Sequence, residues 1–152
     1  MTALAIRRAL PEEAAIIARL YRRTADREWS FLAPHTSAED EAFFLKSFGI
    51  GAIWVAEQDG EIVGFCAVRR GWIDHLFVEH EHHGLGIGQA LLHRALKGRR
   101  RVQIWTFQRN TRARAFYARE GFREVRLTDG ARNEEREPDV MLEWTLSPRA
   151  PV

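Results

Sequence analysis

Three glycines alternate with other residues in the segment His83-Gly84-Leu85-Gly86-Ile87-Gly88, between a predicted strand and a predicted helix. Glycine adopts positive φ angles without strain, so such a loop can turn successive backbone N–H groups toward one point. The N-terminus of the helix that follows adds a partial positive charge there. The segment Gly84–Gln89 is therefore predicted to cradle a phosphate or pyrophosphate group.

Two other phosphate-binding motifs do not match this segment. A Walker A loop requires Lys and then Ser or Thr after its last glycine, whereas Gln89 follows Gly88. A dinucleotide-binding loop requires its third glycine at position 89 and a strand that ends directly before the first glycine, whereas five residues separate Val78 from Gly84. A tight turn without a ligand remains as an alternative, but three glycines at a helix start cost stability unless a ligand uses them.

A second group of residues lies in the predicted helix Asn110–Glu120, which stops at Gly121. Asn110 is a favourable N-cap residue for this helix. Tyr117 carries a phenol with a pKa near 10, which can donate a proton to a thiolate whose own pKa is about 8.5. Ordinary packing of Tyr117 beside Phe116 is the alternative interpretation.

Together these segments resemble the GNAT superfamily of N-acetyltransferases. Trp72–Leu96 is similar to the family's central motif, Q/R-x-x-G-x-G/A after a strand, with Gly86 and Gly88 at the glycine positions and His83 in place of Gln or Arg. Asn110–Phe122 is similar to the family's helix motif N-x-x-A-x-x-F-Y-x-x-x-G-F. The resemblance covers essentially the whole chain. It implies an acetyl-CoA-dependent N-acetyltransferase, with acetyl-CoA as co-substrate and no metal.

The resemblance also implies a role for each segment, in a direct attack of an amine on the thioester through a tetrahedral intermediate. The residues expected to bind the coenzyme are Leu76, Phe77, Val78, His83, Gly84, Leu85, Gly86, Ile87, Gly88, Gln89, Asn110, Phe116 and Tyr117. The backbone of Leu76–Val78 would pair with pantetheine, and an N–H of Phe77 or Val78 would stabilise the oxyanion. Asn110 would hydrogen-bond the pantetheine, and Tyr117 would be the catalytic acid.

The group that takes the proton from the amine is less clearly marked. Asp74 and His75 lie at the start of the strand, and because side chains alternate on a strand, only one of them faces a given side. Asp74 shares a face with Trp72 and Leu76, and we expect it to hold or deprotonate the amine. A structural role for Asp74 and a chain of waters as the base are the alternatives.

The expected acceptor is a primary amine of a small molecule, because the chain is small and shows no extra domain. A protein or peptide N-terminus or a lysine is the alternative, and a non-catalytic acyl-CoA sensor is a further one, against which Tyr117 argues. Trp29 and Phe31 should line the acceptor pocket together with Trp72 and Asp74, since large aromatic side chains are common pocket walls. Burial of Trp29 and Phe31 in the core is the competing explanation.

Acidic residues elsewhere could also attract a cationic amine. Several lie in the segment Asp129–Asp139 between the last two predicted strands, and the others are Asp26, Glu28, Glu39 and Asp40. A charged, solvated loop is the alternative for the segment.

Three further signals are set aside. Glu79–His83 contains His and Glu but lacks the helical or CxxC spacing of a metal site. The basic run Lys97–Arg101 ends a helix, where the helix dipole favours cations. Cys66 lies in the middle of a predicted strand and suits a core position.

Composition places the chain among globular proteins. Its 152 residues are 45% hydrophobic and 29% charged, with a net charge of +2 and one cysteine. We expect one domain over residues 1–146, a flexible tail at 147–152, a cytoplasmic location, no membrane or nucleic-acid partner, and a possible homodimer through the apolar last strand.

Hydrophobic periodicity and turn residues predict the elements that position these segments. Strands are expected at Thr2–Arg8, Ala52–Glu57, Glu61–Val68, Trp72–Val78, Val102–Phe107, Phe122–Leu127 and Val140–Leu146. Helices are expected at Pro11–Arg23, after Thr36 or Ser37, in Gly84–Leu96 and at Asn110–Glu120. This order predicts a mixed α/β fold of the GNAT type, with a twisted, mostly antiparallel sheet, one parallel crossover and flanking helices.

Overall fold

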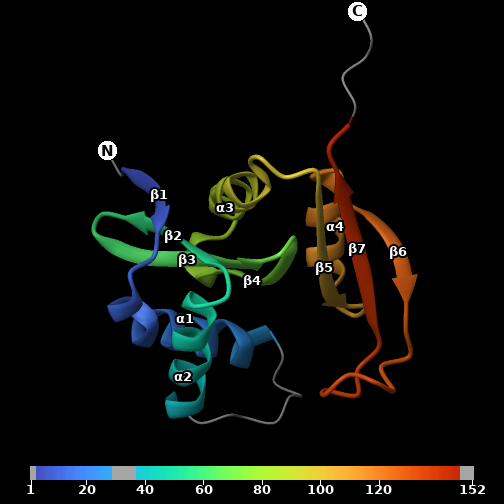
Figure 1. Cartoon of the computed structure of the whole chain (residues 1–152), viewed down its shortest axis with the longest axis horizontal. Coiled ribbons are helices and arrows are strands. Elements are labelled where there is room, and N and C mark those ends of the chain that lie inside the picture. The colour runs from blue at the N-terminus through green and yellow to red at the C-terminus, as the bar shows by residue number, and fades with distance from the viewer. Residues whose placement is uncertain (1–2, 29–36, 148–152) are drawn as a thin grey trace, which may run out of the picture. The chain divides into compact units, whose positions relative to one another are not determined.

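The computed structural model describes residues 3–28 and 37–147, and the side chains of these except for 26–28 and 37 (Figure 1). The strands are β1 (Leu4–Arg8), β2 (Ala52–Gln58), β3 (Glu61–Arg69), β4 (Trp72–Val78), β5 (Arg101–Phe107), β6 (Arg123–Leu127) and β7 (Asp139–Thr145). The helices are α1 (Ala14–Glu28), α2 (Ser37–Phe48), α3 (Ile87–Leu96) and α4 (Thr111–Arg119), with short 3-10 helices η1 (Pro11–Glu13) and η2 (His80–His82). The predicted order of strands and helices is confirmed.

The strands pair in the order β1-β2-β3-β4-β5-β7-β6. β4 pairs with β5 in parallel, Trp72 opposite Gln103 and Ile73 opposite Ile104, whereas β1–β2, β2–β3, β5–β7 and β6–β7 are antiparallel. This confirms the mixed α/β fold with one parallel crossover. Backbone contacts divide the chain into two compact units, Met1–Arg70 with Asp74–Ala95, and Gly71–Ile73 with Leu96–Val152. The single domain over residues 1–146 stays a prediction.

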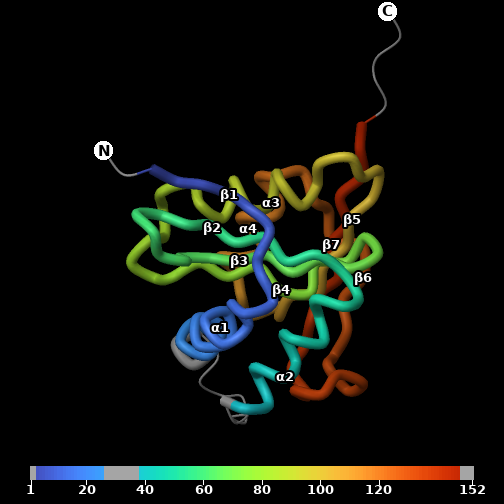
Figure 2. Tube along the Cα trace, turned by 60° about the vertical axis from the view of Figure 1, so that its left-hand side comes forward, coloured from blue at the N-terminus to red at the C-terminus, as the bar shows by residue number. Residues whose placement is uncertain are grey.

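In the first unit, α1 and α2 cover one face of the strands β2 to β4, and α3 covers the other (Figures 1 and 2). A hydrophobic core lies on the face of α1 and α2. Its buried members are Ala9, Ala14, Ile17, Ala18, Leu20, Phe44, Ile53, Val55, Phe65, Ala67 and Phe77. Asp59 and Gly60 form the turn between β2 and β3, and both have positive φ angles, 52° and 82°.

Helix α1 continues five residues beyond the predicted end at Arg23. The reason is that the buried face of the helix continues through a polar residue. Thr24 is buried, and its hydroxyl donates to the carbonyl of Leu20 at 2.9 Å, so it needs no outside partner. Ala25 follows on the same buried face. The predicted capping of α2 by Thr36 or Ser37 lies outside the described side chains.

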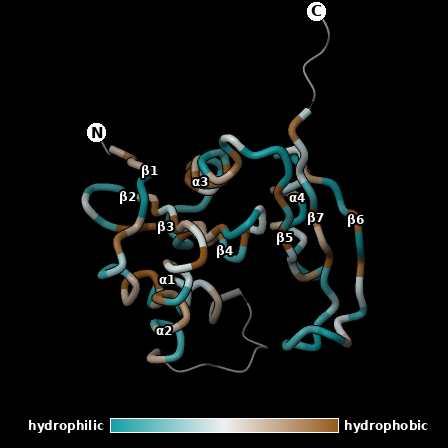
Figure 3. The backbone as a smooth tube through the Cα atoms, viewed as in Figure 1, coloured by the Kyte–Doolittle hydropathy of each residue, from teal (hydrophilic) through white to brown (hydrophobic). Residues whose placement is uncertain are grey.

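The second unit consists of β5, β7, β6 and α4. β7 pairs with β5 along its whole length, and Val102, Val140 and Leu142 are fully or nearly fully buried. The carboxylate of Glu143 is also buried, and it is held by Arg101 at 2.7 Å and by Arg123 at 3.3 Å. Figure 3 shows that the segment between β6 and β7 is hydrophilic along most of its length.

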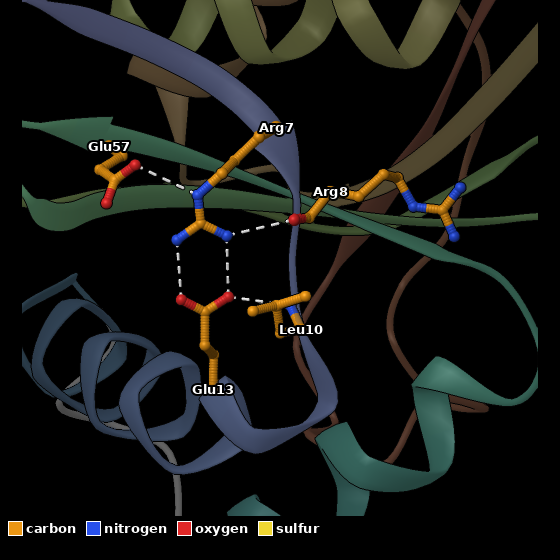
Figure 4. A network of polar contacts seen from close by, with 5 residues as sticks. All are labelled: Arg7, Arg8, Leu10, Glu13 and Glu57. Atoms are coloured by element: carbon orange, nitrogen blue, oxygen red, sulfur yellow. Dashed lines mark hydrogen bonds and ion pairs between the residues drawn. The ribbon is translucent and has the colours of Figure 1, made fainter.

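An ion-pair network joins the start of α1 to strands β1 and β2 (Figure 4). The guanidinium of Arg7 donates to both carboxylate oxygens of Glu13 at 2.9 and 2.8 Å, and to Glu57 at 3.2 Å. Glu13 also accepts from the backbone N–H of Leu10 at 2.8 Å, so it caps the helix start as well. The bond from Arg7 is the main cause that lowers the pKa of Glu13.

We expect Glu13→Gln to lower the free energy of unfolding by about 1 kcal/mol at pH 7, because it removes the bidentate ion pair with Arg7 at a partly exposed site. Since the pKa of Glu13 is depressed in the folded state, the contribution is complete above its ordinary value near 4.5 and is lost as the pH falls through the folded value. Urea unfolding at pH 7 and pH 3.5 measures both effects. Glu12→Gln, at an exposed neighbouring position, is the matched control. Equal effects of the two substitutions at pH 7 would contradict the assignment.

Candidate functional site

The end of strand β4 carries the residues that were expected to hold a ligand through their backbone. Phe77 is buried on the face of α1 and α2, whereas Leu76 and Val78 are half-buried. Val78 lies on the opposite face, because a side chain added at Gly64 would come within 3.2 Å of Val78 and 3.1 Å of Leu91 on α3. The side chains of β4 thus pack against helices on both faces of the sheet. A ligand at this strand would therefore contact mainly its backbone.

The glycine loop forms an open, exposed turn at the start of α3. Gly84 and Gly86 have φ angles of +80° and +81°, and nothing lies within 4 Å of the position that a Cβ would take at either one. The first helical bond of α3 runs from the N–H of Ala90 to the carbonyl of Gly86 at 3.0 Å. The N–H groups of the preceding turn therefore have no acceptor within the helix. These features fit an anion that is bound by backbone N–H groups.

His83 fastens this loop to the end of β4. Its Nε2 lies 2.8 Å from the carbonyl oxygen of Val78, so this nitrogen carries the proton and donates it. Its Nδ1 is buried, and no residue that the structure describes gives it a hydrogen bond. The side chain that replaces the Gln or Arg of the family motif thus positions the loop.

Helix α3 is fixed to the sheet by packing and by a cation–π contact. Its inward face consists of Ile87, Leu91, Leu92 and Ala95, which are all at most 2% exposed. Farther along the helix, the guanidinium carbon of Arg94 lies 4.3 Å from the ring centroid of Trp54 on β2. This contact holds the helix whose N-terminus completes the loop.

In the second unit, α4 carries the other residues of the expected site. The side chain of Asn110 accepts from the N–H of Ala113 at 3.1 Å, which confirms the predicted N-cap. Gly121 ends the helix with a φ angle of +93°. Tyr117 is 4% exposed, and its ring packs edge-on against Phe116 and Phe122 with centroids 5.1 Å apart in both pairs.

Asp74 and His75 lie on opposite faces of β4. Asp74 shares the face of Val78 and forms an ion pair with Arg69 at 2.9 Å. Burial raises the pKa of Asp74, and Arg69 opposes that shift. His75 shares the face of Phe77 and lies among aromatic rings from α1, α2 and β3.

Sequence reasoning weighed His75 only as the neighbour of Asp74. Burial lowers the pKa of His75 to about 4, so its imidazole is neutral at pH 7. The signal that could have found it is the aromatic residues Phe43, Phe44 and Phe65 in the elements predicted to pack on one face of the sheet.

Three of the other acidic residues proposed for the acceptor already bind other side chains of the protein. Asp40 is buried and binds both arms of the Arg22 guanidinium, with a closest N–O distance of 2.8 Å. Asp139 accepts from Thr128 and Asn133, and Glu137 pairs with Arg109 at 3.0 Å. Trp72 is half-buried, whereas Trp29 and Phe31 lie outside the described residues, so the aromatic wall of the acceptor pocket stays a prediction.

The loop Asp129–Asp139 is closed by hydrogen bonds within it and by hydrogen bonds from Gln108. A Cβ at Gly130 would lie 2.4 Å from the carbonyl carbon of Glu137, so the loop turns back tightly on itself. Asn133 donates to the carbonyl of Glu137 at 2.6 Å, and Gln108 donates to the carbonyls of Thr128 and Asp139. This network indicates a structural role for the buried part of the loop.

Neither a metal-binding cluster nor a membrane-spanning helix is found among the residues that the structure describes. Within residues 3–28 and 37–147, no group of three or more His, Cys, Asp or Glu side chains is placed to bind a metal ion. No helix within the same ranges is long and apolar enough to cross a membrane.

Comparison with known proteins adds both sequence and structural relatives. The family model described as "Acetyltransferase (GNAT) domain" matches residues 49–124. The peptidyl-lysine N-acetyltransferase YjaB of Salmonella typhimurium is 32% identical over 119 residues, which are 78% of this chain and 82% of that protein.

Two solved structures share the fold. The solution structure of apo YjaB from Escherichia coli has a TM-score of 0.76 at 23% identity, over 95% of this chain and 99% of that one. The protein yncA of Salmonella typhimurium, solved with its cofactor acetyl-CoA, has a TM-score of 0.76 at 16% identity, over 99% of this chain and 98% of that one.

We expect Gly86→Asp to weaken binding of acetyl-CoA at least tenfold, because its carboxylate would occupy and repel the anion cradle. Gly60→Asp is a matched control, since Gly60 has nearly the same φ angle and equally open surroundings but lies in the β2–β3 turn. Both substitutions therefore carry the same backbone strain. Titration calorimetry measures the affinity, and equal affinities of the two folded variants would place the anion site elsewhere.

Proposed function

Because the chain belongs to the GNAT family of acetyl-CoA-dependent N-acetyltransferases, we propose that it transfers the acetyl group of acetyl-CoA to the side-chain amine of lysine in a protein or peptide. The choice of lysine as the acceptor rests on one observation, the 32% identity over 78% of the chain with a peptidyl-lysine N-acetyltransferase. The small-molecule amine expected from the sequence rested on the small size of the chain and the lack of an extra domain, and the relatives favour its alternative.

Acetyl-CoA would be held mainly by backbone groups. The loop Gly84–Gln89 and the first turn of α3 would bind the pyrophosphate, and the backbone of Leu76–Val78 would pair with the pantetheine arm. A backbone N–H of Phe77 or Val78 would stabilise the oxyanion that forms during attack. The thioester supplies the activated acetyl group.

Three side chains complete the proposal. Tyr117 would protonate the departing thiolate, and Asn110, whose Oδ1 caps α4, would donate from its Nδ2 to the pantetheine. Asp74, whose pKa burial raises, would attract the lysine ammonium in competition with Arg69.

The experiment uses two peptides with blocked N-termini that differ only by lysine or arginine at one position, together with a panel of small primary amines. We expect mass spectrometry to show acetyl-lysine on the first peptide and no product on the second. Tyr117→Phe keeps the ring and should lower kcat about 100-fold with little change in acetyl-CoA affinity. Acetylation of small amines alone would overturn the lysine assignment, and coenzyme binding without any transfer would indicate a sensor.

A further inference from the structure

We propose that a cavity between α1 and the β2–β3 hairpin binds a small linear dication of the aliphatic diamine class. The cavity has a volume of about 500 Å³, which is in the range of small-molecule sites. It is lined by α1, the hairpin, η2 and the start of the chain, all within the first unit. The described residues that line it include neither Leu76–Val78 nor Gly84–Gln89, so the site is separate from the proposed coenzyme site.

Negative charge predominates in this cavity. Five carboxylates line it, those of Glu13, Glu57, Glu61, Glu79 and Glu81. Among the described lining residues, three guanidiniums oppose them, so the formal charge of the cavity is −2 with His82 neutral. The whole chain carries +2, so this concentration of carboxylates runs against the charge of the protein and favours a cationic ligand.

At one end of the cavity, two carboxylates share a single cation. Arg7 lies 2.8 Å from a carboxylate oxygen of Glu13 and 3.2 Å from one of Glu57 (Figure 4). One guanidinium carries one positive charge, so a negative charge remains at this end. The hydrogen bond from Arg7 lowers the pKa of Glu13, which therefore stays ionised at pH 7.

The other end is built on η2. Arg23 of α1 forms an ion pair with Glu79, and the N–H of Glu79 donates to the carbonyl of Val63 on β3 at 2.8 Å. These contacts fix η2 against both α1 and the hairpin, and Glu81 adds a second carboxylate there. The hairpin contributes Glu61, whose side chain has no ion pair or hydrogen bond with any residue that the structure describes.

Apolar side chains line the cavity between these carboxylates. Ile16 of α1 is 40% exposed, Ile62 is half-buried and Val63 is 3% exposed. Methylene groups of a ligand would cover them, whereas a hydrated metal ion would not. No group of three or more His, Cys, Asp or Glu in the described part of the chain is placed to bind a metal. Two ammonium groups joined by an alkyl chain match both the charge and the apolar surface.

Arg19 makes the sign of the ligand testable. It lines the cavity from α1, is exposed, and has no partner among the residues that the structure describes. Its long side chain can turn its charge into solvent when a cation enters. Removal of this charge should strengthen the binding of a dication, but it should weaken the binding of an anion or of an amino acid held by its carboxylate.

The test is an amide NMR titration of the ¹⁵N-labelled protein with 1,4-diaminobutane, at pH 7 and low salt, without acetyl-CoA. We expect saturable shifts centred on residues 60–63 and 79–82. 1-Aminobutane, at equal ionic strength, should bind at least about fivefold more weakly because it lacks the second charge. Added NaCl should weaken the binding of the diamine, since the lining carboxylates are partly exposed.

Three substitutions of exposed residues provide the controls. Glu61→Gln should weaken diamine binding about fivefold, and Arg19→Gln should strengthen it about twofold. Glu41→Gln, on α2 and outside the described lining of the cavity, removes the same charge as Glu61→Gln and should leave the affinity unchanged.

Four results would overturn the proposal: shifts confined to other amides, equal affinity for the monoamine, weaker binding in Arg19→Gln, or no effect of Glu61→Gln. A lysine-rich peptide that shifts residues 60–63 and 79–82 when the diamine does not would also overturn it, and would assign the cavity to a basic protein segment. Because the titration contains no acetyl-CoA, a failure of the proposed acetyl transfer would leave this result intact.

Discussion

The alternation of side chains along β4 is the constraint on which the other features depend. A strand directs successive side chains to opposite faces while its N–H and C=O groups point sideways, so one strand can serve two packing layers and still offer its backbone. Phe77 and His75 face α1 and α2, whereas Val78 and Asp74 face the other way. Gly64 permits the close approach of α3 on that second side. Five residues separate the end of the strand from Gly84, where the glycine loop begins, and the bond from His83 to Val78 holds the loop.

Local rules explain why much of this could be predicted from the sequence. Asp59-Gly60, Asn110 and Gly121 each require a particular backbone geometry, and all three have it in the structure. The buried face of α3 also follows directly from its periodicity. The end of α1 was missed because Thr24 interrupts the apolar pattern, although its hydroxyl is satisfied inside the helix.

The parts of the site that sequence reasoning missed depend on contacts between distant residues. Alternation predicts that Asp74 and His75 face opposite sides, but it does not say which side the aromatic residues of α1 and α2 will cover. Tertiary packing likewise decides which partners the carboxylates have. Asp40 forms an ion pair with Arg22, and Asp139 accepts hydrogen bonds from Thr128 and Asn133. These contacts remove carboxylates that the sequence alone left available for a cationic amine.

The central claim is that backbone groups at the end of β4 and in the glycine loop bind acetyl-CoA, and an amide NMR titration tests it most directly. On addition of acetyl-CoA to ¹⁵N-labelled protein, the account predicts the largest shifts at the N–H groups of residues 76–78 and 84–89, with little change at Asp59 and Gly60 in the β2–β3 turn. Saturable binding that leaves residues 76–78 and 84–89 unshifted and moves other amides instead would contradict it.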